Sequence, residues 1–280
     1  MKTIRTLTLT LALLLLCACV PALAEGELLT CGDYGYRLTD DGGAVLVEYT
    51  GPEGEVVIPD QLDGHPVRAV GDWAFSGCAG LTGVTIPDGV TAIGDWAFSG
   101  CAGLTGVTIP DSVTDIGEYT FVDCAGLTSV TIPNGVTEIG RSVFIDCAGL
   151  TSVTIPDGVT SIGDRAFGKC TGLTSVTIPD GVTSIGEWAF GRCSALTSVT
   201  IPDSVTSIGE AAFYECSALT SVTIPDSVTS IGIGAFAYCG EGFTVTCGEG
   251  SYAEAWCGEN RVAFVYPQPD YTEAPDDWLN

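Results

Sequence analysis

The strongest constraint on this chain is an internal repeat of 23 residues. A phenylalanine followed three positions later by a cysteine recurs in eight successive units, from Phe75 and Cys78 to Phe236 and Cys239. A typical unit reads L-x-x-V-x-I-P-x-x-V-x-x-I-G-x-x-A-F-x-x-C. One unit of this length cannot bury its own apolar side chains, whereas stacked units share one continuous core. The repeat therefore predicts a solenoid.

Each unit divides into a strand and a turning segment. The stretch L-T-S-V-T-I-P alternates apolar and polar residues and is rich in β-branched side chains, which favours a strand with its valine and isoleucine pointing inward. The proline lacks a backbone donor and helps to end the strand, and the following Asp88–Gly89 pair suits a turn. The later segment from Asp95 to Cys101 predicts a short helical turn, with Asp95 near its start.

These units resemble the BspA-like, or Treponema-type, leucine-rich repeat family of bacterial surface and secreted proteins. The resemblance is carried by Leu196–Cys216 and its seven sister units, by the first repeat Glu55–Phe75 with its five-residue insertion, and by the terminal segment Gly250–Tyr266. It implies an α/β-type leucine-rich repeat solenoid, shaped like a horseshoe, strand-dominated with short helical turns, of about eight 23-residue repeats and capped at both ends. It also implies a surface or secreted location, and some members are implicated in adhesion to host or microbial proteins.

The N-terminus predicts export. Residues 1–24 combine basic Lys2 and Arg5 with an apolar stretch and an A-x-A site that ends at Ala24, which indicates a signal peptide cleaved after Ala24. Lipoprotein processing at Cys19 is the alternative. Because no later apolar run is long enough to span a bilayer, we expect a mature chain without a transmembrane segment, outside the cell or at its surface.

The rest of the chain divides into four parts. Residues 25–54 are expected to form an N-terminal β-hairpin cap, and residues 55–246 the leucine-rich repeat solenoid. Residues 247–266 are expected to form a C-terminal capping unit with Ser251 as a helix N-cap, followed by a flexible acidic tail over 267–280.

Charge and composition exclude several function classes. The chain carries 35 acidic and 9 basic residues, a net charge of −26, so nucleic acid would be repelled. It contains one histidine, His65, and one lysine beyond the expected signal peptide, Lys169, and it lacks the common hydrolase, zinc-protease and P-loop motifs. We therefore expect no enzyme and no cofactor or metal.

The cysteine column has four interpretations: a disulfide scaffold, a metal site, reactive thiols, or core. Stacked strands lie about 4.8 Å apart with equivalent side chains in parallel, whereas a disulfide needs Cβ atoms about 3.8 Å apart and inclined toward each other. Zinc needs a tetrahedral cluster, and a reactive thiol needs basic neighbours. We therefore expect reduced core residues. They are Cys78, Cys101, Cys124, Cys147, Cys170, Cys193, Cys216 and Cys239. The candidate disulfide lies outside this column, between Cys247 and Cys257.

Two other columns are candidate binding surfaces. One is a threonine row on the outward side of the strands, which in horseshoe repeats is the concave, protein-binding face. Its members are Thr85, Thr108, Thr131, Thr154, Thr177, Thr200 and Thr223. The other is an aromatic edge at Trp73, Trp96 and Tyr119, with Trp188 further along. The alternatives are that threonine simply favours exposed strands, and that each aromatic ring covers the next coil.

The resulting expectation is a non-catalytic interaction or adhesion module for a host or microbial surface protein. A carbohydrate-binding protein that uses the aromatic edge, and an envelope spacer without a ligand, are the alternatives. The sequence does not define the oligomeric state.

Overall fold

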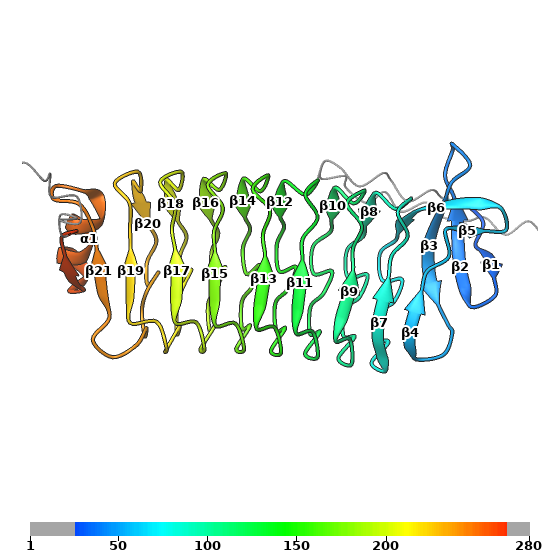
Figure 1. Cartoon of the computed structure of the whole chain (residues 1–280), viewed down its shortest axis with the longest axis horizontal. Helices are drawn as coiled ribbons and strands as arrows, with labels where there is room; N and C mark the ends of the chain where they lie inside the picture. Colours follow the sequence, from blue (N-terminus) through cyan, green and yellow to red (C-terminus); the bar gives the residue numbers. More distant parts are fainter. Residues whose placement is uncertain (1–25, 268–280) are drawn as a thin grey trace, which may run out of the picture.

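The computed structural model of the chain describes residues 26–267. Within them the chain winds into coils that follow one another along the long axis of the molecule (Figure 1). The expected signal peptide with its cleavage site after Ala24, the alternative processing site Cys19, and all but the first residue of the expected acidic tail lie outside the described residues.

Each repeat contributes one strand to each of two sides of the solenoid, where strands of successive coils run parallel. The first side consists of β4 (Gly54–Val57), β7 (Leu81–Thr85), β9 (Gly106–Thr108), β11 (Ser129–Thr131), β13 (Ser152–Thr154), β15 (Ser175–Thr177), β17 (Ser198–Thr200), β19 (Ser221–Thr223), β21 (Thr244–Thr246) and β22 (Ala263–Val265). The second consists of β6 (His65–Val70), β8 (Ala92–Ile93), β10 (Asp115–Ile116), β12 (Glu138–Ile139), β14 (Ser161–Ile162), β16 (Ser184–Ile185), β18 (Ser207–Ile208) and β20 (Ser230–Ile231). Equivalent residues pair in register, as Thr85 does with Thr108, so every repeat column becomes a physical row.

The third side turns through two left-handed residues in each coil. The first has φ between 52° and 65° at Trp73, Trp96, Tyr119, Ser142, Arg165, Trp188, Ala211 and Gly234. The second directly precedes the cysteine, at Gly77, Gly100, Asp123, Asp146, Lys169, Arg192, Glu215 and Tyr238. A left-handed residue other than glycine costs about 1–2 kcal/mol. Hydrogen bonds between coils offset that cost, such as the one from the Phe75 N–H to the Ala97 carbonyl at 2.8 Å.

The segments expected to be short helical turns therefore turn without regular helix. The N–H of Ser76 donates to the carbonyl of Trp73 at 2.9 Å, and that of Cys78 to Phe75 at 3.1 Å, as in successive four-residue turns. Asp95 does not cap a helix. Its carboxylate instead accepts the N–H of Glu118 in the next coil at 2.8 Å. The left-handed residue in each segment is what prevents a continuous helix.

The core is a single row of buried apolar side chains inside the coils. Phenylalanine rings stack from Phe75 to Phe236 with centroids 5.0–5.4 Å apart. Each ring also packs against the valine, isoleucine and leucine columns of its own coil. Burial of each phenylalanine stabilises the fold by about 1.5–3 kcal/mol, so this ladder is a large contribution to the packing of one coil on the next.

The N-terminal coil is covered by an antiparallel unit formed by β1 (Leu29–Cys31), β2 (Tyr34–Leu38) and β3 (Ala44–Tyr49), and β3 then pairs in parallel with β6. The insertion of the first repeat forms a small hairpin from β5 (Gln61–Leu62) and the start of β6. His65 in this hairpin places Nδ1 2.9 Å from the Gly42 carbonyl oxygen. The insertion thus ties the cap to the first coil.

The C-terminal coil is covered by α1 (Tyr252–Asn260), the one helix among the described residues. Ser251 is its N-cap and accepts the Glu254 N–H at 3.2 Å. Trp256 packs edge-on against Phe236, with ring centroids 6.0 Å apart. The helix thereby closes the open end of the phenylalanine ladder.

Candidate functional site

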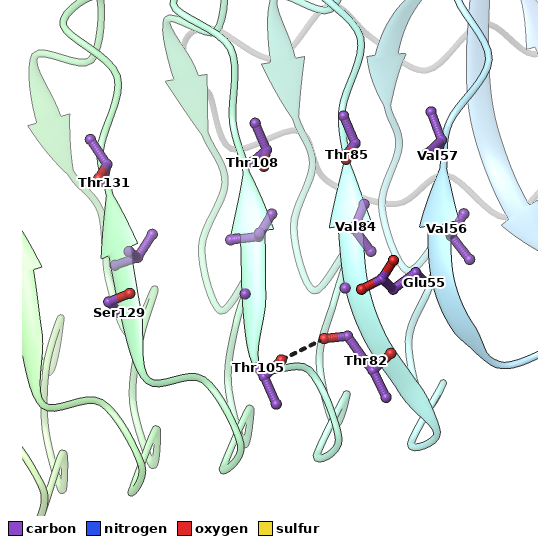
Figure 2. Close-up of a pocket in the computed structure, with 14 residues that line it drawn as sticks. Glu55, Val56, Val57, Thr82, Val84, Thr85, Thr105, Thr108, Ser129 and Thr131 are labelled. Carbon is purple, nitrogen blue, oxygen red and sulfur yellow. Dashed lines mark hydrogen bonds between the residues drawn. The ribbon is translucent and has the colours of Figure 1, made fainter.

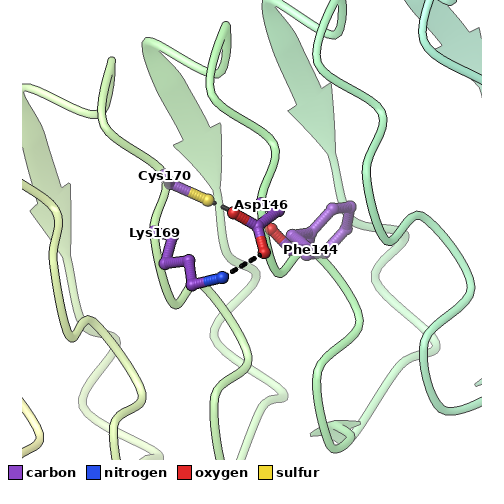
Figure 3. A network of polar contacts seen from close by, with 4 residues as sticks. All are labelled: Phe144, Asp146, Lys169 and Cys170. Carbon is purple, nitrogen blue, oxygen red and sulfur yellow. Dashed lines mark hydrogen bonds and ion pairs between the residues drawn. The ribbon is translucent and has the colours of Figure 1, made fainter. Parts of the chain in front are cut away.

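The cysteine column lies in the interior. Six of its eight members are buried, and the end members Cys78 and Cys239 are half-buried. Each thiol from Cys101 onward donates to the carbonyl oxygen of the phenylalanine 26 residues earlier, as Cys170 does to Phe144 at 3.1 Å (Figure 3). Loss of solvation raises the pKa of Cys101 and Cys193 to about 12. Inward direction, hydrogen bonding and suppressed ionisation make these thiols core groups, and all are free in the structure.

The candidate disulfide pair lies in the C-terminal unit. Cys247 and Cys257 are both buried, and both are free thiols in the structure. Burial, and to a smaller extent the nearby Cys247, raises the pKa of Cys257 to about 11. The two side chains therefore lie near each other, and the disulfide stays a prediction.

The first side of the solenoid presents a polar face, which we call the strand face: the outward residues of β4, β7, β9, β11, β13, β15, β17 and β19. All seven threonines of the predicted row are exposed on it. Figure 2 shows Thr85, Thr108 and Thr131 in line on neighbouring strands. Serines at 129, 152, 175, 198 and 221 are also exposed and run alongside.

The threonines of this chain differ in whether their hydroxyls are already bonded. Thr105, at the start of a strand segment, donates to the carbonyl of Thr82 at 2.9 Å, and its equivalents in later coils bond likewise (Figure 2). Thr160, before the second strand, donates to Thr137 at 3.1 Å. Within residues 26–267, the seven threonines of the predicted row form no side-chain hydrogen bond. Their hydroxyls are free to bind a ligand.

The strand face is hollowed at its N-terminal end. A shallow trough of about 400 Å³ crosses β4, β7, β9 and β11. The side chain is missing from its floor at Gly83 and Gly106, where later coils carry serine. Glu55 lies on the N-terminal side of the trough (Figure 2). The trough is open to solvent and exposes peptide groups together with hydroxyls.

The aromatic residues at the edge stack on one another. Trp73 and Trp96 have centroids 4.9 Å apart and planes 3° from parallel, and Trp96 and Tyr119 are 4.2 Å apart at 5°. Arg141 of the following coil lies over the Tyr119 ring. Both faces of Trp96 are thus covered by neighbouring rings, whereas Trp73 at the end of the stack is 55% exposed. Trp73, covered by Trp96 on one face, is therefore the exposed ring of this stack.

Trp188 does not belong to that stack. It lies three coils beyond Tyr119, and its ring contacts Tyr214 at a centroid distance of 4.9 Å and an angle of 50°. Basic residues gather around it: Arg165, Lys169 and Arg192 share a hollow with the indole. This cluster was not predicted from the sequence, although Lys169 and Arg192 stand out there as the basic residues of a column otherwise made of glycine, acidic residues and tyrosine.

Residues 26–267 contain no group of three or more histidine, cysteine or acidic side chains placed to hold a metal ion. In the same residues, no helix has both the length and the apolar character of a membrane span.

A stack of parallel coils with one inward phenylalanine and one inward cysteine every 23 residues defines a strand-dominated leucine-rich repeat solenoid. The family model of the BspA type leucine-rich repeat region matches residues 55–171 and 137–250, in six copies. The chain belongs to this family, and the predicted resemblance and fold class are confirmed.

Solved structures of similar chains support the same conclusion. A leucine-rich repeat protein of Treponema pallidum is 35% identical, with a TM-score of 0.65 over 69% of this chain and 91% of that one. A leucine-rich cell surface protein of Faecalibacterium prausnitzii is 33% identical, with a TM-score of 0.59 over 80% and 77%. A leucine-rich repeat protein of Bacteroides ovatus is 25% identical, with a TM-score of 0.55 over 79% and 71%. No curated protein matches the chain.

Proposed function

We propose that this chain is an exported bacterial protein that binds another protein through the strand face, as a non-catalytic interaction or adhesion module. The observation that carries the proposal is the contrast between threonine rows. In two other rows, most threonine hydroxyls donate to a carbonyl of the preceding coil, as those of Thr105 and Thr114 do. The seven exposed threonines of the predicted row, such as Thr85, form no side-chain hydrogen bond within residues 26–267.

The chemistry of the strand face limits the partner. Side chains of the free row and the adjacent serines are uncharged, short and regularly spaced, so they suit a surface rich in hydroxyl and amide groups. The trough at Gly83 and Gly106, where the side chain is missing, leaves room for an extended segment to lie against the strand face. A host or microbial surface protein that offers such a segment is the partner we propose.

The proposed location rests on the sequence of residues 1–24 and on the family. A signal peptide cleaved after Ala24 would deliver the chain outside the cytoplasm. The similar protein of Faecalibacterium prausnitzii is described as a cell surface protein. Carbohydrate binding by the aromatic edge has less support than protein binding, because Trp96 is covered on both faces by Trp73 and Tyr119, and Arg141 lies over Tyr119. Trp73 is the ring of this stack that stays exposed. A spacer without a ligand is the outcome if nothing binds.

The test is retention of extracellular proteins by the immobilised mature chain. The preparation is compared with a variant in which Thr85, Thr108 and Thr131 are all replaced by glutamate. These positions are exposed and make no hydrogen bond, so the variant should fold normally. We expect host matrix or microbial surface proteins to bind the native chain and to be lost from the variant.

A matched control carries the same charge change in the same coils on the second side, at Thr91, Thr114 and Thr137. It should retain the partner. Equal retention by all three proteins would refute binding at the strand face, and retention by none would favour the spacer.

A further inference from the structure

A pocket on the turning edge lies apart from the strand face. Its volume is about 270 Å³, and Trp188 and Arg165 line it together with Ile145 and the backbone at Gly168 and Gly191. Lys169 and Arg192 complete the lining. Three of the nine basic residues of a chain with net charge −26 therefore meet in one place.

The repeat explains why a hollow forms at this place. The position after the core phenylalanine is filled by a side chain in every other coil, at Ser76, Ser99, Val122, Ile145, Tyr214 and Ala237. It is glycine only in the two consecutive coils of Gly168 and Gly191. In those same two coils, the position before the cysteine becomes basic, as Lys169 and Arg192. Two independent columns thus depart from the pattern together, which opens a space and places positive charge around it.

The indole forms a fixed wall of this space. A Cβ atom at Gly191 would lie 2.7 Å from Cε3 of Trp188, so the ring lies directly against the glycine backbone. Tyr214 contacts the indole from the next coil. Trp188 and Arg165 occupy equivalent positions of adjacent coils, and both have a left-handed backbone, with φ of 57° and 56°. Both side chains line the pocket.

The three basic side chains of the pocket differ in whether they form an ion pair. Lys169 pairs with Asp146 at 2.8 Å, as Figure 3 shows, and Arg192 pairs with Glu215 at 2.9 Å. Arg165 forms no ion pair and no side-chain hydrogen bond within residues 26–267. A guanidinium offers a planar fork of donors that matches a carboxylate in two parallel hydrogen bonds. Arg165 is therefore the group in this pocket available to a bound anion.

We propose that this pocket binds one carboxylated sugar residue, a hexuronate, with its carboxylate on Arg165 and its apolar ring face on Trp188. The volume lies below the range of drug-sized pockets, about 300–1,000 Å³, which suits a single ring. The acidic remainder of the chain repels a long polyanion, so the ligand is a single or terminal acidic residue. This site is separate from the protein-binding strand face, and the strand-face variants should leave it unchanged.

The experiment is a calorimetric titration of the mature chain with methyl β-D-glucuronide, with methyl β-D-glucoside as the neutral counterpart. We expect saturable binding of the glucuronide that weakens with added salt, and no binding of the glucoside. Arg165→Gln should weaken glucuronide binding at least about tenfold, as loss of a charge-assisted bidentate contact does. Arg141→Gln removes the same charge from the same edge outside the pocket and should bind like the native chain.

A second variant tests the space rather than the charge. Gly168→Ile fills the hollow with the side chain that Ile145 already carries at the equivalent position, and a Cβ atom at Gly168 meets its nearest neighbour at an ordinary 3.4 Å. It should abolish binding with an unchanged circular dichroism spectrum. The proposal is overturned if the glucuronide does not bind, or if Arg165→Gln or Gly168→Ile binds it like the native chain. Equal binding of N-acetylglutamate would overturn the assignment to a sugar.

Discussion

The Sγ atom of Cys147 donates a hydrogen bond of 3.1 Å to the backbone carbonyl oxygen of Phe121 in the preceding coil. The same bond joins Cys101 to Phe75 and Cys216 to Phe190. The Phe121 carbonyl also accepts the backbone N–H of Cys124 at 3.2 Å, so the thiol supplies its second hydrogen bond. We expect Cys147→Ala to lower the free energy of unfolding by about 1–3 kcal/mol, since it opens a cavity and removes one of the two hydrogen bonds to this buried carbonyl.

Cys147→Ser separates the two effects, because it keeps a donor at the same place. Its loss of stability, measured by urea unfolding, should be smaller than that of Cys147→Ala. An equal loss in both variants would show that the hydrogen bond contributes nothing to stability.

The thiol content of the mature protein is the second prediction. All eleven cysteines of the described residues are free thiols in the structure. Titration with a thiol reagent in denaturant without reductant should therefore detect eleven, and titration of the native protein should detect far fewer because most are buried. A count lower by two, with a linked Cys247–Cys257 peptide in the mass spectrum, would establish the candidate disulfide. A count of about one would restore the disulfide scaffold and contradict the core interpretation.

Stability should fall at alkaline pH. Burial raises the pKa of Cys101, Cys147 and Cys193 from 9.0 to about 12, so the unfolded chain releases these protons first. Their stabilising contribution is complete below pH 9 and is lost progressively between about pH 9 and pH 12, by up to about 1.4 kcal/mol per thiol and pH unit. The urea midpoint should drop steeply from pH 8.5 to pH 10. A flat profile over that interval would show that the thiols are not buried.

The aromatic stack should contribute to stability rather than to sugar binding. Trp96 lies between Trp73 and Tyr119, and each such pair contributes about 0.5–1.5 kcal/mol beyond its buried area. Trp96→Ala should lower the melting temperature and remove near-ultraviolet dichroism of the coupled rings, without changing the signals on a glycan array. A glycan signal lost in Trp96→Ala at unchanged folding would instead favour the carbohydrate-binding alternative.

Much of this molecule follows from periodicity. Because strands of successive coils pair in register, a residue such as Phe144 or Thr108 must occupy the same place as its equivalent 23 residues away. The solenoid, the inward phenylalanines and the exposed threonine row could therefore be predicted from sequence. The expected disposition of the cysteines follows from the same geometry.

The turning edge could not be predicted in the same way. The first left-handed position of each coil is occupied by tryptophan, arginine, alanine and glycine alike, so no residue preference marks it in the sequence. The left-handed conformation is stabilised by hydrogen bonds between coils. The sequence therefore predicts a short helical turn from Asp95 to Cys101, where the structure has separate four-residue turns. The pocket beside Trp188 was missed for a related reason: it depends on side chains that are absent at Gly168 and Gly191. The sequence also does not show which threonine hydroxyls form no hydrogen bond, because the three threonine rows have the same pattern in it.

The most direct test of protein binding at the strand face places a photo-crosslinking amino acid at single positions of the mature chain. Thr108 in β9 and Thr114 beside β10 lie in the same coil and are both exposed, but they belong to different sides of the solenoid. After irradiation with the retained partner, the account predicts a covalent adduct from position 108 and none from position 114. Adducts from position 114 alone, or equally from both, would contradict it.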